Sequence, residues 1–527
     1  MPHNNQIRGL LTTAPFFSRR RGILLFCFIY FALNLLFFGR YPLVHSDESW
    51  LAGLTLEMMD LKSLAVTEPF FDLFPRYPHA IKVLFHFLQM PFISLGGFNH
   101  LSVRLLSLLA GGVSLLLFYR ILAPSFGEKT AFLGTGLLAL NIQFILASHT
   151  ARQEVVILCL LLLVFYLGID PGKKDSGAFR QGLVIALAIG IHPNAFLIFL
   201  PALCILLYRL VRREVKLKVL GLFFLPVCTG AAVFVLLSFF FDADFLRHYL
   251  TFGSSVGISA DPFGRLRGFF VFYVKLFYSV TGTYTVPRQK VLWIFYGLIL
   301  LGSVALLGVD KQKKHPLMVE GFLALVGLNL GLLLIGKYSQ PSAVFLLPFL
   351  LLLFLSLVHR LRPSLKTLLP VAAALLFAVV SLVNIRPFLA SDYLQYLGRI
   401  EAALPGEGAV LANLNAGFLF RDRDFRDYRN LAFLEEEGMS FADYIATNNI
   451  TALVVPEELD FIYENRPRWN IVYGNIVPWY RQMLEFIEKR CVLLSEFSDP
   501  YYGMRINAYI AKKDWRVRVY RVLSPET

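Results

Sequence analysis

The stretch His45-Ser46-Asp47-Glu48-Ser49-Trp50 comes only a few residues after the first hydrophobic span, Gly22 to Phe38. A membrane span needs about 20 apolar residues, with about 17 as the lower limit, so this first segment is long enough to cross. Two adjacent acids therefore lie just off a membrane face, at the mouth of whatever the other spans build. We interpret the rest of the chain as a frame that presents a substrate to Asp47.

The composition is that of a polytopic membrane protein. Of the 527 residues, 57% are hydrophobic and 16% are charged, whereas an average soluble domain carries about 25% charged residues. The net charge of +14 could indicate nucleic-acid binding, but much of the lysine and arginine lies in short runs between apolar stretches. Such runs are typical of loops that face the cytoplasm. We therefore expect a membrane protein that binds no nucleic acid.

The termini and cysteines add two expectations. The basic run Arg19-Arg20-Arg21 precedes the first span, and no small-residue cleavage site follows it, which predicts a retained anchor. The five cysteines show no pairing pattern and no Cys-x-x-Cys motif. Neither a disulfide framework nor a zinc ribbon is indicated.

Apolar stretches and the basic residues between them predict about eleven spans. Residues 182–208 are expected to form two short helices that meet at an outer turn, His192-Pro193-Asn194. The amphipathic segment 81–95 and the aromatic segment 266–280 are expected to lie in the membrane interface. An odd number of spans puts the N-terminus in the cytoplasm and the C-terminus outside the cell (plasma or inner) membrane. The remaining predicted spans are 22–38, 101–119, 131–147, 155–169, 219–240, 291–309, 316–335, 341–358 and 367–384.

The composition changes at Arg386, where mixed polar and apolar sequence begins. Short β-rich runs alternate there with helical stretches at 388–403 and 478–490, which favours a small α/β domain. The expected strands are 409–411, 452–455, 491–494 and 508–511. The predicted fold is mostly α: a polytopic transmembrane helix bundle with a C-terminal extracytoplasmic α/β domain. The predicted parts are a cytoplasmic N-terminus (1–21), a transmembrane catalytic module (22–385) and the extracytoplasmic domain (386–527).

This topology gathers ionisable side chains from distant segments on the outer side. None of them needs to sit at the bilayer centre, where a charge costs at least about 2.5 kcal/mol. A cavity that opens outward would explain the gathering. The side chains are Asp47, Glu48, Arg76, His79, Lys82, His149, Arg152, Glu154, His192 and Lys337.

Each motif also has a plain structural interpretation. The acids after Ser46 could cap a helix that starts near Trp50, because acids favour the positive N-terminal end. The segment from His149 to Glu154 could be an ordinary outer loop, His192 a polar turn residue, and Lys337-Tyr338 an interfacial anchor. A separate group has a spacing that could bind a metal, although oxygen ligands are common in polar loops; it consists of Asp242, Asp244 and His248.

The order of motifs carries a resemblance. After the first span come the Asp-Glu pair, a Pro-containing interfacial helix, Arg104 before a Leu-rich span, and Ala-Arg-x-acid at the outer end of the third span. A His-Pro turn between two short helices and a Lys-Tyr with a following Pro complete the set. Over about residues 20–360 this order resembles the lipid-linked-sugar-dependent GT-C glycosyltransferases, the group of bacterial aminoarabinose transferases and protein O-mannosyltransferases.

The resemblance implies roles for particular positions. Asp47 matches the catalytic acid of the family and Glu48 its companion, and Glu154 stands where many members have Asp. His192 stands where many have Lys, and Lys337-Tyr338 where many have Arg-Tyr. The chain has Tyr77-Pro78-His79 where members often have Lys-Pro or His-Pro-Pro. The positive charge at that place would then come from Arg76, His79 or Lys82.

The implied function is transfer of a sugar from a polyprenyl-phosphate donor to a lipid, glycan or protein acceptor at the outer membrane face. We expect Asp47 to be the general base, with Glu48 and Glu154 beside it in the catalytic site. The sequence does not require a metal, although Asp47 and Glu154 could share a divalent cation. The Phe-rich segments 81–95 and 266–280 would line a groove for the isoprenoid tail, or simply pack. The expected donor-phosphate ligands are Arg76, His79, Lys82, Arg152, His192 and Lys337.

The main alternative is a polytopic transporter or lipid flippase. Such proteins place ionisable residues and broken helices near the bilayer midplane, often in two related halves. In this chain the ionisable residues cluster on one side, and no related halves are found. A scaffold role for the outer domain, with the bundle as its anchor, would leave the outer polar groups without a purpose.

Overall fold

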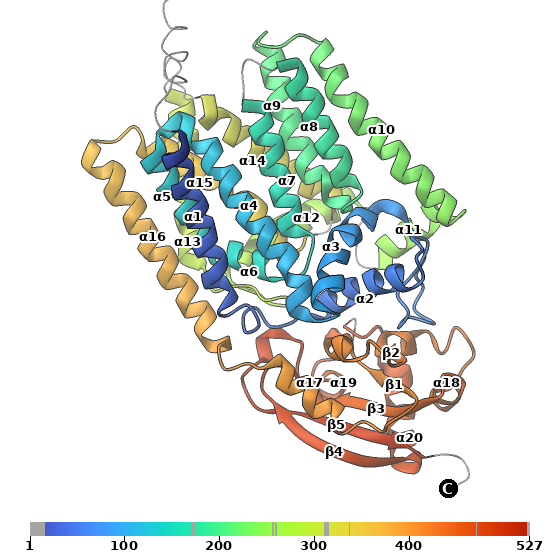
Figure 1. Cartoon of the computed structure of the whole chain (residues 1–527). Helices are drawn as coiled ribbons and strands as arrows, with labels where there is room; N and C mark the ends of the chain where they lie inside the picture. Colours follow the sequence, from blue (N-terminus) through green and yellow to red (C-terminus); the bar gives the residue numbers. More distant parts are fainter. Residues whose placement is uncertain are drawn as a thin grey trace, which may run out of the picture.

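The computed structural model describes residues 16–169, 174–255, 258, 261–309, 316–336, 338–470 and 472–523. Most of them form a bundle of long apolar helices. Residues 386–523, which we call the C-terminal part, form a five-stranded sheet with short helices. Figure 1 shows the C-terminal part packed against one end of the bundle, the end opposite to the start of α1 (Phe16–Leu35).

An apolar helix covers each of the predicted spans. By length and composition, seven helices of the described chain could cross a membrane, or eight when one bent pair is counted as a single span. Shorter apolar helices accompany them, so the predicted number of about eleven stays a prediction. The bundle helices are α1, α4 (His100–Phe126), α5 (Glu128–Ala139), α6 (Ile142–His149), α7 (Glu154–Ile169), α8 (Lys174–Ile189), α9 (Phe196–Val211), α10 (Lys218–Phe241), α13 (Lys290–Val309), α14 (Pro316–Ile335), α15 (Leu347–Val358) and α16 (Pro363–Ile385).

The bent pair is α5 and α6, whose axes differ by 65°. Asn141 begins α6, because its side-chain oxygen accepts a hydrogen bond from the backbone N–H of Gln143 over 2.9 Å. Its side-chain nitrogen donates to the hydroxyl of Tyr296 on α13 over 2.6 Å. The bend therefore has a local cause in a capping residue, and it turns the end of α6 toward the C-terminal part.

Short helices cover the end of the bundle that faces the sheet. They are α2 (Ser46–Asp60), η2 (Ala80–Lys82), α3 (Val83–Gly96) and α11 (Phe245–Ser255), and Figure 1 shows α2, α3 and α11 at this end. The aromatic segment after α11 forms α12 (Pro262–Phe277). Between α8 and α9 the chain turns through η4 (Pro193–Ala195), so the prediction of two short helices meeting at His192-Pro193-Asn194 is confirmed.

The C-terminal sheet has the strand order β2-β1-β3-β5-β4. β1 lies parallel to β2 and β3, whereas β5 runs antiparallel to β3 and β4. The strands are β1 (Ala409–Ala412), β2 (Phe425–Asp427), β3 (Ile450–Pro456), β4 (Cys491–Asp499) and β5 (Trp515–Val522). The helical segments are η6 (Arg386–Phe388), α17 (Tyr393–Glu401), η7 (Leu414–Leu419), η8 (Tyr428–Phe433), α18 (Phe441–Thr447), α19 (Glu457–Asn465), η9 (Pro467–Trp469), α20 (Val477–Arg490) and η10 (Asn507–Tyr509).

Three of the four predicted strands are confirmed, and one is wrong. Residues 508 and 509 lie within the turn of η10, and the chain then passes through Ala511, which has a positive φ of 57°. The last strand is instead β5, where inward-facing Trp515, Val517 and Val519 alternate with arginines. Alternation with period two is the strand signal, and the short apolar run at 508–511 lacks it. The predicted mostly helical fold with a C-terminal α/β part is confirmed.

One apolar cluster joins the bundle end to the C-terminal part. It combines Val44, Ala52 and Phe70 from the segment around α2 with residues such as Val410 and Phe418 of the C-terminal part. Burial of apolar area is the dominant favourable term in folding, at about 25 cal/mol per Å². Because the cluster crosses the junction, α2 is held in place by both sides.

Candidate functional site

The start of α2 sets the directions of the two adjacent acids. His45 caps the helix: its Nδ1 accepts a hydrogen bond from the backbone N–H of Asp47 over 3.0 Å, and its own backbone N–H donates to Glu48 Oε1 over 2.9 Å. This is a capping box with histidine as the first residue. Successive helix residues point about 100° apart. The two carboxylates therefore face different surroundings.

Glu48 lies in the interior of the molecule. Arg104 of α4 donates to both of its oxygens over 2.7 Å, and both side chains are fully buried. The same guanidinium also donates to the backbone oxygens of Phe38 and Pro42, and Glu48 accepts from the backbone N–H of Ala151. Glu48, expected beside Asp47 in catalysis, thus ties α2, α4 and the α6–α7 junction together.

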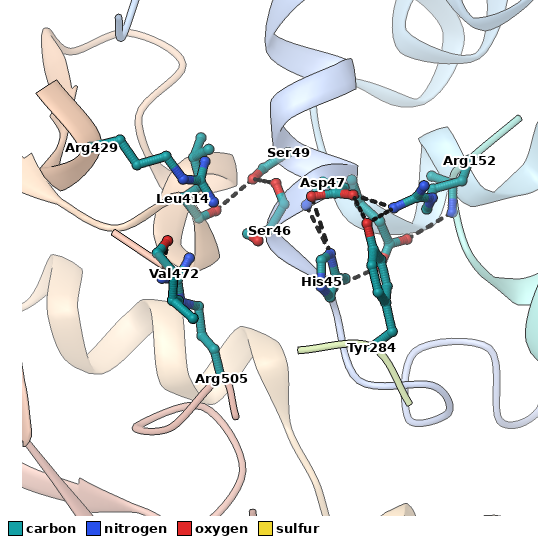
Figure 2. Close-up of polar contacts among 12 residues, drawn as sticks. His45, Ser46, Asp47, Ser49, Arg152, Tyr284, Leu414, Arg429, Val472 and Arg505 are labelled. Carbon is teal, nitrogen blue, oxygen red and sulfur yellow. Dashed lines mark hydrogen bonds and ion pairs between the residues drawn. The ribbon is translucent and has the colours of Figure 1, made fainter. Parts of the chain in front are cut away.

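Asp47 faces a polar cluster made by distant segments (Figure 2). Arg152, between α6 and α7, pairs with Asp47 and also with Glu154, at 3.0 Å from Glu154 Oε1. The hydroxyl of Tyr284, in the loop between α12 and α13, donates to Asp47 Oδ2 over 2.6 Å. The Tyr284 ring stacks on His45 with centroids 4.5 Å apart. The predicted gathering of Asp47, Arg152 and Glu154 is thus observed.

The surrounding charges keep Asp47 ionised. Burial by itself would raise the pKa of Asp47, but the charge of Arg152 and the hydrogen bond from Tyr284 hold that pKa well below its ordinary value. Burial would likewise lower the pKa of Arg152, yet Glu154, Tyr284 and Asp47 raise it well above its ordinary value. The resting site is a network of charges in which each carboxylate already has a partner.

Arg76, expected to bind phosphate, pairs with a different acid. Its guanidinium donates twice to Glu68 over 2.8 Å, and both side chains are buried. Burial would raise the pKa of Glu68, but Arg76, Lys82 and a hydrogen bond from Trp50 lower it to about 2. Lys82 lies in η2, close enough to act on Glu68. Arg76 and Lys82 therefore form a second charged group around Glu68, on the side of Trp50.

The two remaining predicted cations within the described ranges, His79 and His192, contact groups other than Asp47. His79 is packed among aromatic rings, with Tyr249 at 5.6 Å, and burial together with Lys82 and Arg76 holds the pKa of His79 well below its ordinary value. His192 caps η4, because its Nδ1 accepts from the backbone N–H of Asn194 over 3.1 Å. Lys337 lies outside the described residues. Its neighbour Tyr338 donates to the backbone oxygen of Arg265 over 2.7 Å.

Sequence reasoning missed the residues that close the site. Tyr284 follows the aromatic segment 266–280, and the polar run Thr283-Tyr284-Thr285 on the predicted outer side was the available signal. The C-terminal part supplies a wall: Ser49 donates to the backbone oxygen of Leu414 over 2.5 Å, and Arg429 and Arg505 lie on the far side (Figure 2). A cavity of about 50 Å³ at this junction is lined by His45, Arg152, Glu154, Tyr284 and Arg505, among others.

The carboxylates near Arg152 do not present a metal site as they are placed. The guanidinium of Arg152 pairs with both Asp47 and Glu154, the two acids that could have shared a cation. A divalent cation requires several open oxygen ligands, and these oxygens are already engaged by an arginine. Within the described ranges no group of three or more His, Cys, Asp or Glu side chains is placed to hold a metal ion. We assign no chemical step to a metal.

The second candidate metal site, Asp242, Asp244 and His248, forms separate side-chain pairs. Asp242 Oδ2 lies 2.6 Å from His248 Nδ1, and Asp244 pairs with Arg247 at 2.7 Å. The His248 ring also stacks on Tyr77 with centroids 3.5 Å apart. These contacts join α11 to the loop that precedes α3, which is the plain structural interpretation of the group.

A large apolar cavity of about 760 Å³ lies between α12, α13, α14 and α15. Its walls are almost entirely hydrophobic and aromatic, with Phe269 and Phe277 on α12 and Leu330 on α14 among them. The hydroxyl of Tyr273 donates to Asn329 Oδ1 over 2.5 Å in the same wall. The Phe-rich segment 266–280 therefore does line a cavity, as the sequence suggested.

Comparison with known proteins gives concordant results. Residues 79–239 match the family of dolichyl-phosphate-mannose-protein mannosyltransferases. No curated protein matches the chain. Among solved structures, ArnT from Cupriavidus metallidurans in the apo state is similar at 13% identity, with 95% of this chain and 98% of that chain covered and a TM-score of 0.51. The oligosaccharyltransferase of Archaeoglobus fulgidus in the apo form is similar at 12% identity, with 92% and 74% covered and a TM-score of 0.51.

The fold and the family match together define the class. The chain is a multi-pass membrane protein with the GT-C glycosyltransferase fold, and the predicted resemblance to that superfamily is confirmed. Within the class, its partial family match is to the protein mannosyltransferases, and its ArnT likeness extends over almost the full length of both chains. The partial family match, together with this fold, favours glycosyl transfer over the alternative of a transporter or flippase.

Proposed function

We propose that the protein transfers a sugar from a polyprenyl phosphate to an acceptor hydroxyl at the outer face of the cell membrane, with Asp47 as the general base. The observation that carries the proposal is the cluster of Asp47, Arg152, Glu154 and Tyr284, placed where the bundle meets the C-terminal part. The ArnT structure that contains undecaprenyl phosphate has the same fold, with 12% identity and a TM-score of 0.51, which supports a donor of this type.

The chemistry would be a single displacement. The acceptor oxygen attacks the anomeric carbon while an Asp47 oxygen takes its proton, and the bond between that carbon and the phosphate oxygen breaks. The phosphate leaves with the bonding electron pair, so the anomeric centre inverts. A positioned base contributes about 10²–10⁴-fold to such a step. Arg152 is the nearest cation that could stabilise the departing phosphate.

The lowered pKa of Asp47 means that the proposed mechanism needs a step that makes Asp47 a stronger base. A carboxylate held well below its ordinary pKa is a weak base, because Brønsted behaviour favours a pKa near the working pH. If Arg152 turns from Asp47 to the phosphate of the bound donor, the main charge that lowers the pKa of Asp47 is withdrawn. Glu154 would hold Arg152 during this exchange, since it pairs with the same guanidinium. Donor binding would thus make Asp47 a stronger base.

The cavity between α12 and α15 would hold the isoprenoid tail. It is apolar, about 760 Å³ in volume, and partly walled by α12, the helix from which the chain runs on to Tyr284. Ligand pockets of about 300–1,000 Å³ are the usual range for bound small molecules. A tail seated there would extend away from a head group at Asp47. The N-terminus would then be cytoplasmic and the C-terminal part extracytoplasmic.

The test is the Asp47→Asn variant in purified protein, assayed for glycosyl transfer from a polyprenyl-phosphate sugar. We expect a loss of at least about 10²-fold in turnover. Asp60→Asn, at the exposed far end of the same helix, is the matched control and should retain wild-type turnover. Wild-type-like turnover of a folded Asp47→Asn protein would end the assignment of Asp47 as the base.

A further inference from the structure

Arg429 stands out among the buried arginines around α2. It lies in η8 of the C-terminal part, and its side chain is 13% exposed. Its Nη1 atom is buried and has no hydrogen-bond partner among the described residues. A buried donor without an acceptor is costly, so the feature calls for an explanation.

The neighbouring arginines are paired more closely with carboxylates than Arg429 is. Arg76, Arg104, Arg152 and Arg505 each lie within 3.2 Å of a carboxylate oxygen. The carboxylate paired with Arg429 is Asp427, at 3.9 Å. The oxygens of Asp427 also accept from the backbone N–H groups of Leu414 and Arg429 over 2.9 Å. Arg429 therefore has a long ion pair, and its Nη1 atom has donors left for a further acceptor.

The guanidinium of Arg429 is oriented toward the catalytic face of α2. Its central carbon lies 4.9 Å from the centre of the Trp50 ring. Trp50 is three residues beyond Asp47, and residues at this spacing are neighbours on one helix face, with about 5–6 Å between their Cβ atoms. Figure 2 shows the Arg429 side chain reaching from the C-terminal part toward α2. The charge of Asp47 acts on Arg429 at this distance.

The geometry also suits a particular ligand chemistry. The central carbon of the guanidinium lies over the Trp50 ring, and the N–H donors project from the edge of the guanidinium plane. Such a fork matches the oxygens of a phosphate, to which arginine can donate two parallel hydrogen bonds. Burial and the charge of Arg505 lower the pKa of Arg429, and Asp427 opposes this; an incoming anion would further stabilise the charged guanidinium.

We propose that Arg429 and Trp50 form a phosphate-binding subsite, through which the C-terminal part holds an anionic group of a substrate beside Asp47. This inference rests on the proposed function and extends it, because it gives residues 386–523 a share in substrate binding. The phosphate belongs either to the polyprenyl-phosphate donor or to a phosphorylated acceptor. Both sources present tetrahedral phosphate oxygens to the guanidinium, as a monoanionic diester in the sugar donor and as a monoester in free polyprenyl phosphate or a phosphorylated acceptor.

The experiment compares Arg429→Gln with Arg481→Gln in the purified full-length protein. Arg481 is an exposed arginine of the same C-terminal part, and it donates to Tyr463. The probes are undecaprenyl phosphate, the uncharged polyprenol of equal length, and inorganic phosphate, each titrated at equilibrium. Hydrogen bonds to charged groups are worth about 1.5–3 kcal/mol, which corresponds to at least about tenfold in affinity.

We expect Arg429→Gln to lower the affinity for inorganic phosphate and for undecaprenyl phosphate at least about tenfold. Its affinity for polyprenol, and all three affinities of Arg481→Gln, should equal those of the wild type. That outcome assigns the phosphate to the donor. If inorganic phosphate weakens and undecaprenyl phosphate does not, the subsite is supported with the acceptor as the source. Unchanged affinity for both phosphates would overturn the subsite.

Two further measurements, the melting temperature and the phosphate affinity of the wild type, distinguish this inference from a structural role of Arg429 and from the proposed function. Ligand-free Arg429→Gln should melt no lower than the wild type, because a loosely paired buried charge with an unused donor has been removed. Arg429→Lys should retain part of the phosphate affinity. A lower melting temperature with unchanged phosphate affinity would overturn the subsite in favour of a structural role. Wild-type protein that binds neither phosphate would overturn the proposed function as well.

Discussion

Tyr284 donates its hydroxyl hydrogen to Asp47 Oδ2 over 2.6 Å, although the two residues are 237 positions apart in the chain. The same hydroxyl accepts a hydrogen bond from Arg152 over 2.5 Å. The loop between α12 and α13 therefore reaches the start of α2 and fixes the orientation of the Asp47 carboxylate. That loop also continues from the helix that lines the apolar cavity.

Replacing Tyr284 with Phe should change the pH dependence of the reaction. Asp47 must be ionised to act as a base, so activity is lost as the pH falls through its pKa. Removing the Tyr284 hydrogen bond raises that pKa from its lowered value, and the acid limb of the kcat/KM profile should move to higher pH. We also expect about a tenfold lower kcat/KM. Tyr166→Phe, at an exposed position of α7, is the control. An unshifted profile in Tyr284→Phe would contradict this account.

The Glu48–Arg104 pair should govern stability. Glu48→Gln leaves a buried arginine without its countercharge, and breaking a buried pair costs about 3–5 kcal/mol. The measurement is the melting temperature and the folded yield of the purified protein. The double variant Glu48→Met with Arg104→Met should lose less than the sum of the two single variants, because neither charge is left alone. Additive losses would show that the two side chains act independently.

Acid should release the Arg76–Glu68 pair. The pKa of Glu68 is lowered to about 2 in the folded protein, against about 4.3 for a free glutamate. The sign follows from linkage: this stabilisation is fully present above the unfolded pKa and is lost as the pH falls from about 4.3 to about 2. Melting temperatures across this range should therefore fall less steeply for Glu68→Gln than for the wild type. Equal slopes would contradict the assigned shift.

Gly417 lies close against Ser49 of α2. A Cβ atom at this position would lie 2.9 Å from Ser49 Cβ and 3.0 Å from its hydroxyl oxygen. Gly417→Ala should therefore displace the Ser49–Leu414 hydrogen bond and lower turnover more than it lowers expression. Gly398→Ala in α17 is the matched control, since nothing lies within 4 Å of its Cβ position. A fully active Gly417→Ala protein would show that this contact does not position α2.

The sequence predicts the helices and the central acid well, because both depend on local pattern. Apolar length identifies the spans, and the acids after Ser46 identify the start of α2. The gathering of Asp47, Arg152 and Glu154 also follows, since charges avoid the bilayer and collect at one end of the bundle. The strand at 515–522 was missed because its alternating arginines made a half-buried strand look polar.

The partners of each charge could not be predicted. Whether Arg76 faces a substrate or Glu68, and whether Glu48 faces the site or Arg104, depends on how a helix is rotated about its axis. That rotation is set by tertiary contacts such as the His45 cap and the apolar cluster that spans the junction. Tyr284 and Arg429 come from loops and turns of unrelated sequence, so their approach to α2 is visible only in three dimensions.

The apolar cluster and the Ser49–Leu414 bond hold the helix of the acid between two parts of the chain. Neither part can be exchanged alone. A chimera with the sheet of another protein would need a backbone carbonyl at the place of Leu414 and a glycine at the place of Gly417 to position Asp47 correctly. Lineages that diversify this protein should therefore vary the rim of the C-terminal part freely while carrying its inner face and α2 as one inherited module.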